Sequence, residues 1–146
     1  MFKNEEIDIQ LLEQQMDQNI FDIFQDYLPR DWYEVVFFAG YYKDDSCYLK
    51  YWVRGENGPF INCFNLIPEP QEGEEDIIQE QLMELHREIK FVRTNLNDKQ
   101  KWVCMEMTLT SQGHMSKKYD YADGVAEADL KQYVENYKSK LNEKYD

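Results

Sequence analysis

Apolar residues recur between positions 78 and 96 in steps of four, three, four, three and four residues. Because 3.6 residues complete one helical turn, this spacing places them on a single face of an α-helix. The stripe consists of Ile78, Leu82, Leu85, Ile89, Val92 and Leu96. Carboxylates precede it and basic residues lie near its end, as the helix dipole favours. We therefore predict a helix over residues 74–97, which separates two β-rich parts of the chain.

Two further stripes predict helices near the ends of the chain. The first covers residues 5–27, where apolar residues recur at three- and four-residue steps until Pro29 disfavours helical geometry in the preceding residue. The other follows Gly124 and includes Leu130, Tyr133, Tyr137 and Leu141, which predicts a final helix over residues 125–143.

The segments between the predicted helices have the composition of β-strands. Residues 33–67 hold three runs rich in β-branched and aromatic residues, separated by turn sequences, and residues 101–121 hold two more around Gly113. Strands joined by such short turns pair antiparallel. We predict one α+β domain over residues 1–146, with three helices, a mostly antiparallel sheet of about five strands and the order αβββαββα.

Charge restricts the classes of partner that the chain can bind. It contains 29 acidic and 16 basic residues, which give a net charge of -13. Such a field repels nucleic acid and anionic membranes, and it accelerates encounter with a cationic partner. No apolar stretch resembles a signal peptide or a membrane span, and three unpaired cysteines indicate reduced core thiols. We expect a cytoplasmic protein that binds neither nucleic acid nor membranes.

No sequence motif points to catalysis. His86 and His114 are the two histidines, and neither lies in a recognisable arrangement with a serine, cysteine or acid. The cysteines lack the close pairing of structural zinc ligands, and glycine-rich phosphate-binding loops are missing. We predict that the protein is not an enzyme and has no metal site and no cofactor. The enzymatic alternative requires a deep pocket that holds a strongly perturbed titratable group.

Two acidic segments are candidates for protein binding. Seven acidic residues and no basic residue lie between Glu69 and Glu84, and their centre supplies four predicted contact residues: Glu72, Glu74, Glu75 and Asp76. The alternative is a solvated helix terminus. The second segment alternates carboxylates with an aromatic anchor, in Asp120, Tyr121 and Asp123. Its alternative is that the tyrosines pack against the final helix.

Aromatic residues on the sheet are a third candidate. Phe38, Tyr48, Trp52 and Trp102 are expected on the face opposite the core, where Trp52 would anchor a partner if no helix covers it. With three helices and one small sheet, burial of this face is the alternative.

Several motifs together resemble the YezG-like antitoxin (immunity) family. They are the run Leu28-Pro29-Arg30-Asp31-Trp32-Tyr33-Glu34-Val35, then Met107-Thr108-Leu109-Thr110, and then Gly113 followed by Tyr119-Asp120-Tyr121-Ala122-Asp123. The resemblance extends from about Ile20 to Tyr121. It implies an α+β fold and a cytoplasmic antitoxin, because members of the family neutralise nuclease toxins of the LXG type that Gram-positive bacteria export by type VII secretion.

The sequence therefore predicts an acidic immunity protein that binds a basic nuclease toxin domain, as a monomer or a weak homo-oligomer. The acidic residues named above would steer and pair with toxin cations, and Tyr121 and Trp52 would act as anchors. The alternative is a generic adaptor or regulatory module that binds a cellular protein through the aromatic sheet face.

Overall fold

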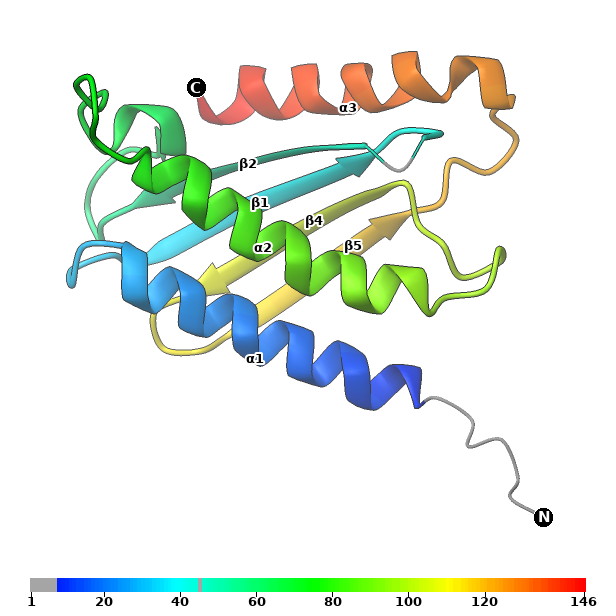
Figure 1. Ribbon diagram of the computed structural model, residues 1–146, viewed down its shortest axis with the longest axis horizontal. Helices are drawn as coiled ribbons and strands as arrows, with labels where there is room; N and C mark the ends of the chain where they lie inside the picture. The colour runs from blue at the N-terminus through cyan, green and yellow to red at the C-terminus, as the bar shows by residue number, and fades with distance from the viewer. Residues whose placement is uncertain (1–7, 45) are drawn as a thin grey trace.

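Five strands form one antiparallel sheet in the spatial order β3-β2-β1-β4-β5, and three helices pack on it (Figure 1). The computed structural model describes residues 8–44 and 46–146. The elements are α1 (Ile9–Tyr27), β1 (Glu34–Tyr41), β2 (Cys47–Arg54), β3 (Ile61–Asn62), the 3-10 turn η1 (Cys63–Asn65), α2 (Ile77–Thr94), β4 (Cys104–Thr110), β5 (Met115–Asp120), the 3-10 turn η2 (Glu127–Asp129) and α3 (Leu130–Tyr145). The predicted α+β class and element order are confirmed.

Helices α2 and α3 begin later in the chain than the sequence predicts. Asp76 caps α2, because its side chain accepts a hydrogen bond from the Gln79 amide, so this helix starts at Ile77 rather than at residue 74. A 3-10 turn precedes α3 and delays its start to Leu130. Residues 5–7 of the first predicted helix lie outside the described residues.

The third predicted strand is reduced to two residues. At Asn62 the chain turns into η1, and the Asn62 side chain accepts a hydrogen bond from the Phe64 amide at 3.0 Å. This local bond competes with continued strand pairing. As a result, β3 pairs with Trp52 and Val53 of β2 and with no other described residue of that strand.

Helices α1 and α2 together cover one face of the sheet. Alternate residues of β1 and β2, among them Phe37 and Tyr51, point into this layer and are completely buried. Phe24 of α1 packs edge-on against both rings, with centroid distances of 5.7 and 5.0 Å. The apolar stripe of α2 lies against the same face, as its spacing predicts, with Leu85 and Ile89 at its centre.

Helix α3 covers the opposite face, above β1 and β2 (Figure 1). Val134 and Leu141 of this helix are buried against Val36, Phe38 and Trp52. A glycine in β1 permits the close approach, because a Cβ atom at Gly40 would lie 2.6 Å from Cγ1 of Val134. Both faces of the sheet are therefore occupied by helices. Among the described residues, no helix combines the length and the apolar character that a bilayer span requires.

Candidate protein-binding surfaces

The acidic segment before α2 lies at the surface. Glu72, Glu74 and Glu75 are exposed, and together with Glu69 and Asp76 they belong to the connection between η1 and the helix. Glu69, Glu74, Glu75 and Asp76 line a shallow hollow of about 210 Å³ together with Phe64 and Ile77, which are both exposed. Asp76 differs from the others, because its carboxylate caps α2 and is thus used inside the protein.

The carboxylates of this segment, from Glu69 to Glu84, form no ion pair with any residue in the described part of the chain. A hydrogen bond with Glu75, and then the negative charge of the same residue, raise the pKa of Glu80 above its ordinary value. We call the exposed carboxylates Glu72, Glu74 and Glu75 the α2 acidic cluster. A bound cation would relieve the repulsion between Glu75 and Glu80.

The second acidic segment follows β5 and contains one carboxylate that is used internally. Asp120 accepts hydrogen bonds from the Ala122 amide at 2.8 Å and from the Tyr133 hydroxyl at 2.5 Å. These bonds hold a tight turn in which Ala122 is buried and has a φ of 52°. Tyr121 is 42% exposed and Asp123 is also exposed, so these two side chains face solvent and Asp120 stabilises the turn.

The two acidic segments lie at opposite ends of the sheet (Figure 1). Asp120 pairs with Cys104 at one end, whereas α2 starts beside β3, which pairs with Trp52 and Val53 towards the other end. The structure therefore does not unite the eight predicted contact residues in one surface. Whether either segment touches a partner stays a prediction.

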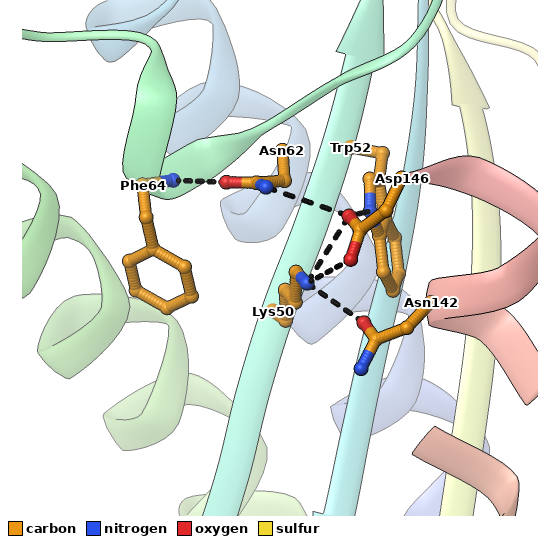
Figure 2. A network of polar contacts seen from close by, with 6 residues as sticks. All are labelled: Lys50, Trp52, Asn62, Phe64, Asn142 and Asp146. Atoms are coloured by element: carbon orange, nitrogen blue, oxygen red, sulfur yellow. Dashed lines mark hydrogen bonds and ion pairs between the residues drawn. The ribbon is translucent and has the colours of Figure 1, made fainter. Parts of the chain in front are cut away.

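Trp52 is buried, so the prediction of an exposed aromatic anchor is wrong. Its side chain is 0% exposed beneath α3, and Figure 2 shows its indole facing Asp146, to which Nε1 donates a hydrogen bond at 2.7 Å. The Lys50 ammonium donates to the same carboxylate and to Asn142 at 2.7 Å. The network fixes the end of α3 to β2.

Three of the four aromatic residues predicted on this sheet face are buried, and the fourth, Tyr48, is half-buried. Phe38 is also 0% exposed, and its ring stacks on Tyr137 of α3 with a centroid distance of 5.2 Å. Trp102 lies in the other layer, where its ring packs edge-on against Tyr41. Because α3 covers this face, the adaptor alternative loses the surface on which it was based.

A cluster that sequence reasoning missed joins Tyr41, His86 and Cys47. His86 Nδ1 lies 3.1 Å from the Tyr41 hydroxyl oxygen and 3.2 Å from Cys47 Sγ. Burial, and then the positive charge of Lys90, lower the pKa of His86, while burial raises the pKa of the Cys47 thiol. Both directions favour neutral side chains, whereas a nucleophilic cysteine needs a thiolate beside a cationic group.

His86 lies 39 positions from Cys47 and 45 positions from Tyr41 in the sequence, so no local motif could have revealed the cluster. Over residues 8–44 and 46–146, no group of three or more histidine, cysteine or acidic side chains is arranged to hold a metal ion. The arrangement thus offers packing and hydrogen bonds rather than an activated group.

An α+β fold with helices on both faces and acidic residues at its surface is suited to recognition of another macromolecule through its edges and loops. Comparison with protein-family models matches residues 13–143 to the family described as "Immunity protein YezG-like". The match covers most of the chain, which therefore belongs to the YezG-like immunity protein family. Membership implies a toxin protein as the partner. A search of the curated proteins finds no match.

Proposed function

We propose that this chain neutralises a nuclease toxin by binding it directly, with the α2 acidic cluster paired to basic residues of the toxin. Family membership supports the immunity role. The observation that carries the nuclease part is that Glu72, Glu74 and Glu75 are exposed without a cationic neighbour among the described residues.

A nuclease supplies the charge that this surface lacks. Proteins that hold nucleic acid present lysine and arginine side chains to the phosphates, and most of their affinity comes from these contacts. A set of carboxylates can form ion pairs with the same lysine and arginine side chains and thereby exclude the nucleic acid. The long-range attraction also accelerates association, which matters for an antitoxin that must reach its target before the nucleic acid is cut. No covalent step is needed, and the action would take place in the cytoplasm.

The proposal is tested by reversing the cluster to lysine in the triple variant Glu72→Lys, Glu74→Lys, Glu75→Lys. Asp76 is kept, because its loss would remove the cap of α2 and confuse binding with stability. The matched control reverses Asp31, Asp98 and Glu143, which are exposed residues outside the cluster. Both variants therefore change the net charge equally.

The assay uses the nuclease domain of a toxin that co-purifies with this protein from its host. It measures the association rate at low and high salt, and growth rescue on co-expression. We expect the cluster variant to associate about tenfold to a hundredfold more slowly at low salt, and the control to change much less. The cluster variant should also lose most of the salt dependence. Equal effects of the two variants would show that only net charge matters, and unchanged binding by the cluster variant would refute the proposed contact.

Tyr121 and Asp123 are a second, independent test at the far end of the sheet. Tyr121→Ala removes an exposed aromatic side chain and leaves the Asp120 turn intact. A loss of affinity for the same nuclease domain would extend the contact to this end, since tyrosine is enriched among the interface residues whose truncation costs more than about 1 kcal/mol. Unchanged affinity would restrict the contact to the α2 end.

A further inference from the structure

Among residues 8–44 and 46–146, no strand pairs with the outer edge of β2 at Cys47, Tyr48 and Leu49, so this edge is open. The Tyr42 amide donates a hydrogen bond to the Ser46 carbonyl at 2.8 Å, so Tyr42 and Ser46 form a hydrogen-bonded pair. With the β1–β2 register, this pair determines which residues of β2 bond to β1. Because hydrogen-bonded and non-bonded positions alternate in an antiparallel pair, the amides and carbonyls of Cys47 and Leu49 point away from β1. β3 pairs only with Trp52 and Val53, so it does not reach them.

The unpaired stretch ends at Tyr51, the next residue of β2 whose backbone groups point away from β1. Burial raises the pKa of the Cys63 thiol in η1, and the backbone of Tyr51 opposes this rise, so the Tyr51 backbone faces Cys63 at this point of the edge. A groove of about 290 Å³ runs beside the open stretch, between β2 and α2, and its walls include Leu49, Phe64, Leu82, Met83 and His86. Phe64 is 50% exposed and Met83 is 56% exposed, and Figure 2 shows the Phe64 ring on the side of β2 away from β1.

The other edge of the sheet is protected, which makes the open stretch on β2 distinctive. β5 carries Lys117 and Lys118, and Lys117 forms ion pairs with Glu13 and Asp17 of α1. Lysines on an edge strand discourage the addition of another strand. The sequence Cys47-Tyr48-Leu49 contains no charge and no proline, so it has neither of these protective features.

We propose that an extended segment of the toxin adds to this edge of β2 as a further strand, collinear with β3. Its backbone would satisfy the outward groups of Cys47 and Leu49, and every second side chain would be apolar and enter the groove beside Met83. A segment of about three residues, roughly 10 Å long, matches the open stretch from Cys47 to Leu49. The identity of the partner rests on the proposed function.

Carboxylates near the groove favour an added strand that carries a basic residue. The groove itself is lined by uncharged side chains, because burial keeps the pKa of His86 below its ordinary value. Phe64 lines both the groove and the neighbouring hollow, which contains Glu74 and Glu75. A lysine or arginine of the added strand near Phe64 would therefore meet two carboxylates of the α2 acidic cluster. The segment thus combines apolar residues at alternate positions with a basic residue at one end.

The first test compares two exposed apolar residues of the same helix. Met83 lines the groove, whereas Phe91 is 61% exposed and lies two turns further along α2, outside it. Met83→Lys and Phe91→Lys make the same change in net charge. For binding of the same nuclease domain as above, we expect Met83→Lys to raise Kd about tenfold or more and Phe91→Lys to change it less than about twofold. Equal effects would overturn the proposal.

The second test measures amide hydrogen exchange of the unmodified protein by NMR, with and without the same domain. The amides of Cys47 and Leu49 should exchange fast in the free protein and become protected in the complex, with contacts between backbone protons of the two chains. The outward amides of Lys117 and Tyr119 on β5 are the control and should not change. Protection without interchain backbone contacts would overturn strand addition.

The outcomes separate this inference from the proposed function. If the wild-type protein binds and neutralises the toxin while the β2 edge stays unprotected, strand addition fails and the proposed function stands. If the wild-type protein does not bind the toxin, both fail. Concentration-dependent protection of Cys47 and Leu49 in the absence of toxin would instead assign the edge to a second copy of this chain, and would overturn the toxin strand.

Discussion

Removal of the Asp146 carboxylate should destabilise the protein measurably, because this group neutralises a buried cation (Figure 2). The Lys50 side chain is 7% exposed, and its ammonium lies 3.1 Å from Asp146 Oδ2. In Asp146→Ala the lysine keeps only the neutral acceptor of Asn142, and the indole N–H of Trp52 loses its acceptor. Two buried donors then lack adequate partners.

The magnitude follows from these two losses. Removing one partner of a fully buried ion pair costs about 3–5 kcal/mol, and an unsatisfied buried donor costs about 1–3 kcal/mol. The Asp146 side chain is 38% exposed, so water can reach the vacated position and reduce both terms. We expect a loss of about 2–3 kcal/mol in the free energy of unfolding. With about 2.1 cal/mol/K per residue for the unfolding entropy, this corresponds to a fall in Tm of about 7–10 °C.

Thermal and urea unfolding of four variants would test this reasoning. Asp146→Asn retains an acceptor without the charge and should lose about half as much stability as Asp146→Ala. Lys50→Met in the Asp146→Ala background removes the isolated charge and should recover part of the loss. Lys50→Met alone serves as the reference. A change below about 0.5 kcal/mol in Asp146→Ala would refute the role of the network.

The pH dependence gives an independent check of the sign. Burial raises the pKa of Asp146, but hydrogen bonds from Trp52 and Lys50 and the charge of Lys50 outweigh it and leave the pKa below the ordinary value of 3.8. A carboxyl whose folded pKa is depressed stabilises the protein above its unfolded pKa, and this contribution is lost as the pH falls through the folded value. The difference between wild type and Asp146→Asn should therefore shrink below pH 3.8. A constant difference down to full protonation would contradict the ionic origin.

Two further predictions concern packing and thiol chemistry. Gly40→Ala places a methyl group against Val134 and should cost about 1–3 kcal/mol in urea unfolding, and the double variant with Val134→Ala should be more stable than the sum of the single changes predicts. Burial raises the pKa of Cys63 to about 11 and that of Cys104 to about 12, and it also raises that of Cys47. At pH 8 a thiol reagent should therefore react with the buried Cys63 and Cys104 only after denaturation, whereas rapid labelling of these two thiols in the native protein would show that their sites open.

The periodic parts of the fold could be predicted from the sequence. The stripe of α2 and the alternation of Leu49 and Tyr51 in β2 follow from the geometry of a helix and a strand, and both place their apolar residues in the layer that α1 and α2 share. The short length of the third strand could not be predicted from the sequence. Its aromatic and β-branched residues favour pairing, but the Asn62 side chain bonds the Phe64 amide and turns the chain out of the sheet.

The surface was harder to predict, because it depends on how distant elements dock. Composition identified the acidic segment, but burial of Trp52 depends on the turn at Ala122 and Gly124, which directs α3 across the sheet. Because residues other than glycine rarely adopt a positive φ, this conformation of Ala122 could not be predicted from the sequence. The open edge of β2 likewise exists only because β3 ends early.

The burial of Trp52 also makes it a spectroscopic probe of one layer of the fold. Trp32 and Trp102 lie in the layer formed with α1 and α2, so Trp52 is the only one of the three tryptophans beneath α3. In a Trp32→Phe, Trp102→Phe background, tryptophan emission would report whether α3 rests on the sheet or has separated from it. Emission that shifts to longer wavelength before the helical circular dichroism is lost would reveal that the two layers come apart in separate steps.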